Sequence, residues 1–107
     1  MSIRFASAFA VCLLLALPAA AQKKGDPVKG KEVYEQCGVC HAATTNEKKM
    51  GPSLKGLYKK AKMANGKAVN DATVTEIINK GGNGMPAFEE ILEGDELVNL
   101  IAYLKTL

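Results

Sequence analysis

The clearest hydrophobic pattern in this chain lies at its C-terminal end. Four apolar residues there fall at positions i, i+3, i+4 and i+7, namely Leu97, Leu100, Ile101 and Leu104. That spacing puts all four side chains on one face of a helix. It predicts an amphipathic helix over residues 95–106.

A second helix is predicted over residues 27–37. Asp26 can accept hydrogen bonds from the free amides at its start, and Pro27 loses nothing at the first helical position. Three side chains at helical spacing define its inward face: Val33, Tyr34 and Cys37. Gly30 costs on the order of 1 kcal/mol relative to alanine in a helix, so it marks either a tolerated weakness or a close approach by another helix.

A third helix is predicted to end at Lys80, because Gly81 favours a stop. Asp71 or Thr73 is the expected cap, and Glu76 is placed to complete a capping box with Thr73. Its inward residues are Val74, Ile77 and Ile78.

The remaining segments contain turns and loops. A lysine-rich stretch over residues 57–62 predicts a short helix, and a glycine-rich loop follows at residues 81–86. No segment has the alternating pattern of a strand. The expected fold class is therefore all-α, with three main helices and short helical turns.

Residues 1–21 have the pattern of a secretory signal peptide. Arg4 supplies a positive start, residues 5–17 form an apolar run, and small residues up to Ala21 form a cleavage site. A spanning helix needs about 20 apolar residues, so an uncleaved membrane anchor is the weaker alternative. We expect cleavage after Ala21, export to the periplasm and no stable membrane insertion afterwards.

Cleavage leaves residues 22–107, which have room for one domain. Residues 22–107 contain no tryptophan and only four aromatic side chains: Tyr34, Tyr58, Phe88 and Tyr103. Domains of this size often need a metal, a disulfide or a cofactor for stability. The composition therefore predicts that another group completes the core.

The charges of the chain are distributed unevenly. Residues 23–80 carry 12 lysines and 6 acidic residues, whereas residues 81–107 carry 5 acidic residues and one lysine, so their net charges are +6 and −4. Such an asymmetry can orient the molecule toward a charged partner protein. The lysines lack interleaved arginines or an aromatic platform, which argues against a nucleic-acid partner.

The motif CGVCH at residues 37–41 holds both cysteines of the mature chain and its single histidine. On a helical turn Cys37, Cys40 and His41 share one face, so all three side chains can point at the same group. The C-x-x-C-H pattern is typical of c-type haem attachment, in which the thiols form thioether bonds and the imidazole reaches the iron. Haem c, bound covalently and one per chain, is the expected cofactor.

Three other interpretations of the motif fit less well. A structural zinc site needs four ligands, and no fourth cysteine or histidine is present in the mature chain. A thioredoxin-like switch needs its C-x-x-C in a βαβ unit, which an all-helical chain does not have. A disulfide between Cys37 and Cys40 can form in an oxidising compartment, but it would leave the small core incomplete.

The second axial ligand of the iron decides what the haem does, since a thioether closes the site and raises the reduction potential. Three methionines compete for that position. Met50 lies only nine residues after His41, and Met63 lies in a lysine-rich part of the chain. Met85 stands in the glycine-rich loop before Pro86, which favours extended backbone there, and it is the preferred ligand.

The chain resembles the small class I cytochromes c of bacteria over nearly all of residues 26–107. The resemblance rests on motifs in the family's order: Gly30 with Tyr34, CGVCH at 37–41, GPSLKGL at 51–57, GMPAF at 84–88 and LIAYL at 100–104. It implies three main helices around a largely buried haem, with His41 and Met85 as axial ligands. It also implies that the carbonyl of Pro52 accepts the second ring N–H of His41.

The predicted function is one-electron transfer between redox partner proteins by a monomer, without catalytic residues. An iron with protein ligands on both sides changes little in geometry between its oxidation states. Two alternatives remain open: a haem enzyme or gas-binding protein in which Met85 is labile, and a dedicated cytochrome subunit of a larger oxidoreductase. Lys60 stands where many relatives carry an arginine, so it is a candidate neighbour of a haem propionate.

Overall fold

Three α-helices and one short 3-10 helix make up the part of the protein that the computed structural model describes, residues 24–107. In chain order they are α1 (Pro27–Tyr34), η1 (Leu57–Lys59), α2 (Asp71–Lys80) and α3 (Glu96–Leu104). This part of the chain has no strand, only isolated bridges that pair Lys62 with Ala68 and Gly82 with Met85. The predicted all-α fold class is confirmed.

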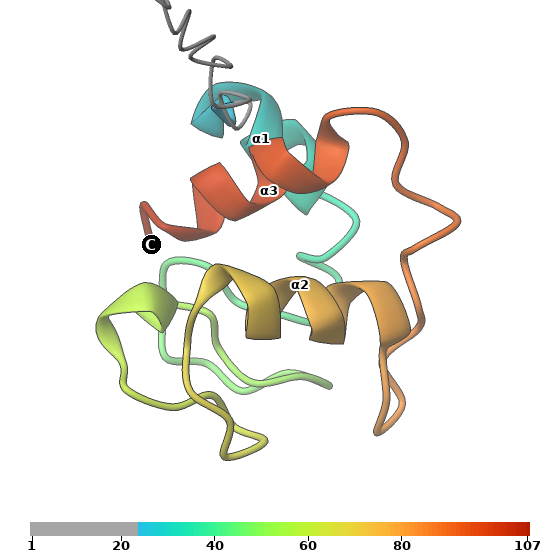
Figure 1. Ribbon diagram of the computed structural model, residues 1–107. Coiled ribbons are helices and arrows are strands. Elements are labelled where there is room, and N and C mark those ends of the chain that lie inside the picture. The colour runs from blue at the N-terminus through green and yellow to red at the C-terminus, as the bar shows by residue number, and fades with distance from the viewer. Residues whose placement is uncertain (1–23) are drawn as a thin grey trace, which may run out of the picture.

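Helices α1 and α3 lie across each other at one end of the described structure, and α2 lies below them in Figure 1. The loops around η1 run behind and below α2. No helix within residues 24–107 is both long enough and apolar enough to cross a membrane. The predicted signal peptide, residues 1–21, lies outside the described residues.

Helix α1 begins where the sequence predicts but ends earlier. The Asp26 side chain caps it by accepting two backbone hydrogen bonds, and Pro27 is its first residue. Past Tyr34 the backbone tightens, because the amides of Cys37 and Gly38 both donate to the Tyr34 carbonyl, at 2.7 and 2.9 Å. The expected helix end at Cys37 is therefore wrong, and the CGVCH motif lies on a turn that follows α1.

Helix α2 ends at Lys80 as predicted, but its cap is neither Asp71 nor Thr73. The Asn70 side chain accepts a hydrogen bond from the Thr73 amide at 2.9 Å, and the Thr73 hydroxyl accepts one from the Asn70 amide at 3.1 Å. The capping box therefore starts at Asn70, with Thr73 in the place expected for Glu76. Asparagine takes the cap because its short side chain reaches the third helical amide while its own backbone stays extended.

The other two elements are shorter than predicted. The short helix expected over residues 57–62 is a single turn, because the backbone of Lys60 is extended at φ −91° and ψ 147°. Helix α3 covers Glu96–Leu104 rather than residues 95–106. The predicted inward residues do face the core: Val74, Ile78, Leu100, Ile101 and Leu104 are buried, and Ile77 and Leu97 are half-buried.

The contact between α1 and α3 centres on Gly30. A Cβ atom at this position would overlap the backbone carbonyl of Asn99 and lie 2.8 Å from Cβ of Tyr103. One helical turn further on, the rings of Tyr34 and Tyr103 pack with centroids 5.3 Å apart and an interplanar angle of 55°. Of the two explanations for this glycine, the close approach of a second helix is the one that the structure supports.

The core of the described residues is small. Only Leu100 and Val74 are at most 2% exposed, while a larger set of apolar side chains around the core is only partly buried. That set includes Leu54, Met63, Ile77, Met85 and Phe88. Partly buried apolar surface of this extent favours a further apolar group packed against it, as the composition predicts.

A polar cluster ties the start of α2 to η1 and to the end of α3. Asp71 accepts hydrogen bonds from the Lys105 ammonium and from the Tyr58 hydroxyl, both at 2.9 Å. Both bonds lower the pKa of the Asp71 carboxyl, and the bond from Lys105 has the larger effect. Burial, and then the bond to Asp71, raise the pKa of Tyr58. Asp71 therefore stabilises the fold at pH values above the usual carboxyl pKa. This stabilisation is lost as the pH falls through the lowered pKa of Asp71.

Replacing Gly30 by alanine tests the helix crossing. Gly30→Ala should lower the free energy of unfolding by about 2 kcal/mol or more, because the added methyl group forces α1 and α3 apart. Gly38→Ala is the matched control, since a Cβ there would meet its nearest neighbours at 3.5 Å, an ordinary contact distance. Guanidinium unfolding measures both variants, and equal stability of the two would contradict the crossing geometry.

Candidate functional site

The CGVCH residues form a closed turn after α1. The amides of Cys40 and His41 both donate to the carbonyl of Cys37, at 3.1 and 3.0 Å, which is the hydrogen bonding of one helical turn. A turn of this kind keeps residues i, i+3 and i+4 on one side. The backbone therefore places Cys37, Cys40 and His41 together, although on a turn separate from α1.

Tyr34 joins this turn to the helix crossing. Its hydroxyl donates to the carbonyl oxygen of His41 at 2.7 Å. Burial, with further contributions from Cys37 and Tyr103, raises the pKa of Tyr34 to about 12, so the hydroxyl stays protonated at physiological pH. Residue spacing places Tyr34 on the inward face of the helix, but it does not reveal this hydrogen bond, because the chain turns back past the helix end.

The His41 ring is held along one edge by a two-residue segment, Gly51 and Pro52. Its Nδ1 lies 2.7 Å from the carbonyl oxygen of Pro52. Because a carbonyl only accepts, this contact requires a proton on Nδ1 and leaves a lone pair on Nε2 of the neutral ring. A Cβ on Gly51 would lie 2.7 Å from Nδ1 and 2.9 Å from Nε2, so a glycine is needed for the ring to fit. The Gly51 amide also donates to the Cys40 carbonyl at 2.8 Å.

Cys37 and Cys40 are free thiols, and both are partly buried. Burial, and then the neighbouring Cys40, raise the pKa of the Cys37 thiol. Since a dithiol switch works through a thiol of lowered pKa, this environment argues against the thioredoxin-like interpretation. Within residues 24–107, no group of three or more His, Cys, Asp or Glu side chains is placed to hold a metal ion.

The three candidate methionines lie in different environments. Met50 is 85% exposed, and its Sδ lies 4.0 Å from Cys40 Sγ. Met63 and Met85 are partly buried and pack against the hydrophobic core. The backbone of Met85 is fixed by two hydrogen bonds with Gly82, each of 3.0 Å, across the glycine-rich loop. The exposure of Met50 argues against it as an iron ligand and leaves Met85 and Met63.

These groups fit a covalently bound haem. Such a haem needs two thiols for its vinyl carbons, an imidazole nitrogen for its iron and apolar side chains around its ring. Cys37 and Cys40 supply free thiols, and the bond from Nδ1 of His41 to Pro52 reserves Nε2 for a metal. The partly buried apolar residues around the core supply the remaining surface.

Comparison with known proteins agrees with this site. The profile of the family described as "Cytochrome C oxidase, cbb3-type, subunit III" matches residues 25–104. Cytochrome c6 of Rippkaea orientalis (strain PCC 8801 / RF-1) is 34% identical over 93 residues, which cover 86% of this chain and 78% of that protein. Cytochrome c6 of Diacronema lutheri is 34% identical over 82 residues, which cover 75% of this chain and 94% of that protein.

Solved structures share the fold. Cytochrome c6 from the diatom Phaeodactylum tricornutum superposes with a TM-score of 0.59 at 25% identity, over 77% of this chain and 93% of that one. Cytochrome cH from Methylobacterium extorquens superposes with a TM-score of 0.56 at 20% identity, over 78% of this chain and all of that one. This chain therefore belongs to the monohaem class I cytochromes c, within the cbb3-type oxidase subunit III family, and its cofactor is a covalently bound haem c.

Proposed function

We propose that this cytochrome is a periplasmic one-electron carrier with a six-coordinate iron. Cys37 and Cys40 attach its haem c. His41 and Met85 would hold the iron. The observation that carries the proposal is the 2.7 Å contact between Nδ1 of His41 and the carbonyl of Pro52, which leaves one imidazole nitrogen for the metal. Family membership makes the chain an electron carrier rather than an enzyme.

The bound haem supplies an iron that accepts and releases one electron. The residues of the chain would fix the positions of the groups around that iron. Pro52 orients the His41 ring and makes the imidazole a stronger donor through its Nδ1 proton. Met85, whose backbone is fixed by its bonds to Gly82, would supply a sulfur ligand that keeps outside ligands from the iron. A thioether in that position also raises the reduction potential.

The compartment and the partners are inferred from the N-terminal pattern and the charges. Residues 1–21 have the features of a cleaved export signal, and residues 22–107 would form the mature cytochrome domain. Covalent attachment keeps the haem from being lost outside the cytoplasm. The positive residues 23–80 and the negative residues 81–107 would orient the monomer toward charged redox partners, with a dependence on salt.

A dedicated subunit of a larger oxidoreductase is the second candidate, because the matching family profile is that of an oxidase subunit. Gentle isolation from the native cell distinguishes a free carrier from a subunit. A free carrier is recovered as a small protein alone, whereas a subunit co-purifies with a larger redox protein.

Carbon monoxide binding tests the six-coordinate site. The ferrous wild-type protein should not bind carbon monoxide at neutral pH, whereas Met85→Ala should bind it readily and have a lower reduction potential, because its iron has lost the sulfur ligand. Met63→Ala and Met50→Ala are controls that should keep the wild-type absorption spectra. Loss of coordination in Met63→Ala instead would assign the ligand to Met63. A five-coordinate wild-type spectrum would overturn the carrier function.

The fit of the histidine is tested by Gly51→Ala. A methyl group at this position would push the His41 ring away from Pro52, so the ferric low-spin spectrum should be lost at a lower guanidinium concentration than in wild type. Gly38→Ala again serves as the control, because it adds a methyl group within the motif at ordinary contact distance. The same midpoint for both variants would show that Gly51 does not hold the ring.

A further inference from the structure

The described residues contain two Asn-Gly pairs, at residues 65–66 and 83–84. In such a pair the glycine amide nitrogen can attack the side-chain carbonyl carbon of the asparagine, because no side chain on the glycine hinders the approach. The attack closes a succinimide ring and releases ammonia, which takes the glycine amide proton with it. Water then breaks one of the two ring C–N bonds, which gives aspartate or isoaspartate. Both pairs lie on exposed loops, so access of water does not distinguish them.

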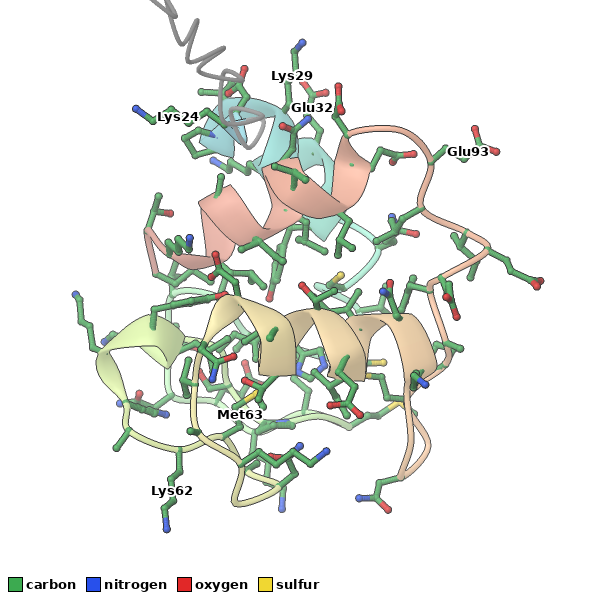
Figure 2. All side chains as sticks on the ribbon, in the orientation of Figure 1. Lys24, Lys29, Glu32, Lys62, Met63 and Glu93 are labelled. Carbon is green, nitrogen blue, oxygen red and sulfur yellow. The ribbon has the colours of Figure 1, made fainter. Side chains whose placement is uncertain are left out.

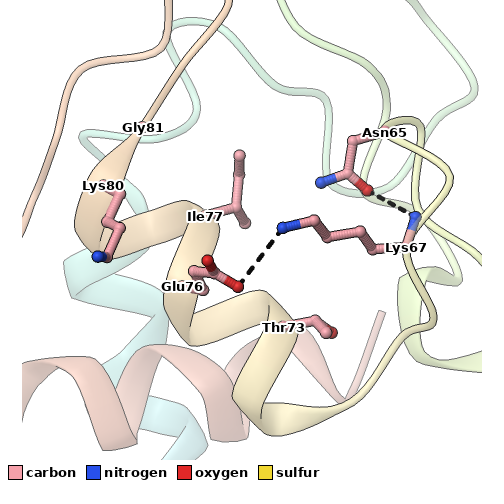
Figure 3. Close-up of a pocket in the computed structure, with 7 residues that line it drawn as sticks. All are labelled: Asn65, Lys67, Thr73, Glu76, Ile77, Lys80 and Gly81. Carbon is pink, nitrogen blue, oxygen red and sulfur yellow. Dashed lines mark hydrogen bonds and ion pairs between the residues drawn. The ribbon is translucent and has the colours of Figure 1, made fainter.

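Hydrogen bonds hold both reacting groups of the first pair, Asn65 and Gly66. The Gly66 amide donates to the carbonyl of Met63 at 2.9 Å. Met63 is itself partly buried and packs against the core below α2 (Figure 2). The Oδ1 atom of Asn65 accepts a hydrogen bond from the Lys67 amide at 3.0 Å (Figure 3). Attack at this pair therefore requires two hydrogen bonds to break in a loop that is anchored to the core.

The reacting groups of the second pair, Asn83 and Gly84, have no such bonds. Their loop projects below the end of α2 (Figure 1). Among residues 24–107, neither the Asn83 side chain nor the Gly84 amide has a hydrogen-bond partner. Apart from its chain neighbours, no atom lies within 4 Å of the place where a Cβ on Gly84 would stand. The bonds between Gly82 and Met85 close the turn without using either reacting group.

The backbone of this turn also favours rotation of Asn83. Its φ is 50°, and it is the only non-glycine residue of the described chain with a positive φ. The left-handed conformation costs a residue with a side chain roughly 1–2 kcal/mol. Gly82 and Gly84, with φ of 130° and 86°, restrict the backbone on either side little. Rotation of Asn83 toward the attacking nitrogen therefore breaks no side-chain hydrogen bond and relieves this strain.

We propose that Asn83 is a deamidation site and that its isoaspartate product loosens the loop that carries Met85. In isoaspartate the main chain runs through the former side chain and is longer by one methylene group. That extra length falls between Gly82 and Met85, whose two hydrogen bonds of 3.0 Å hold the turn. The second part of the inference rests on the proposed function, because it needs Met85 as a ligand of the iron.

Peptide mapping by mass spectrometry tests the deamidation site. Purified holoprotein is incubated at neutral pH and raised temperature, and the conversion of each asparagine to aspartate or isoaspartate is followed with time. Asn83 should convert at least about tenfold faster than Asn65, because Asn65 reacts only after its loop has opened. The same incubation in guanidinium removes the folded contacts, so both pairs should then convert at similar rates.

Two results would overturn the deamidation site. One is equal or faster conversion of Asn65 in the folded protein, because the hydrogen bonds at Asn65 would then give no protection. The other is conversion of neither asparagine in the folded protein while both convert in guanidinium, because the turn at residues 82–85 would then protect Asn83 as well.

Carbon monoxide binding by the same samples tests the effect on Met85. The ferrous wild-type protein should gain binding during the incubation, in proportion to the isoaspartate formed at Asn83. Asn83→Gly is the matched control, because glycine adopts a positive φ without strain and has no side-chain amide to lose. Its carbon monoxide binding should not change during the incubation.

The outcomes of this second experiment separate the inference from the proposed function. An equal gain of carbon monoxide binding by wild type and Asn83→Gly would overturn the effect of deamidation on Met85. Binding by the fresh wild-type protein would instead overturn the proposed function, while the conversion of Asn83 would still be decided by its mass.

Discussion

The rest of the structure depends on the crossing of α1 and α3 at Gly30. A side chain there would overlap the backbone of Asn99, so the two helices approach as closely as backbones can. The amide of Asp26 adds a hydrogen bond to the Asn99 side chain at 2.8 Å. One turn beyond the crossing, the Tyr34 hydroxyl binds the carbonyl of His41. A contact between the two ends of the described chain thus sets the place of the turn that carries the cysteines and the histidine.

Backbone groups hold the histidine more than side chains do. The carbonyl of Pro52 fixes the ring, and the missing side chain of Gly51 makes room for it. The small core and the partly buried apolar side chains around it leave the domain dependent on its cofactor, which agrees with membership of the cytochrome c family. On this account the haem is part of the hydrophobic core as well as the redox centre.

The periodicity of apolar residues predicts the three helices, and the C-x-x-C-H pattern predicts the haem, because both signals are local in sequence. Two predicted helix boundaries were wrong, because neighbouring residues compete for the same hydrogen bonds. Asn70, rather than Asp71 or Thr73, caps α2, and α1 ends before Cys37. The contacts that spacing could not reveal are those between segments, above all the hydrogen bond from the Tyr34 hydroxyl to the His41 carbonyl. The choice between Met63 and Met85 is also of this kind, since both are partly buried.

Hydrogen exchange in Tyr34→Phe tests most directly whether the helix crossing holds the CGVCH turn. This variant keeps the ring that packs on Tyr103 and removes only the hydroxyl that binds the His41 carbonyl. The account predicts that the amides of Cys40 and His41 exchange about tenfold faster, as expected for the loss of one partly buried hydrogen bond, while the amides of α2 keep their rates. Unchanged exchange at Cys40 and His41 would contradict it, because the covalent attachments alone would then hold the turn.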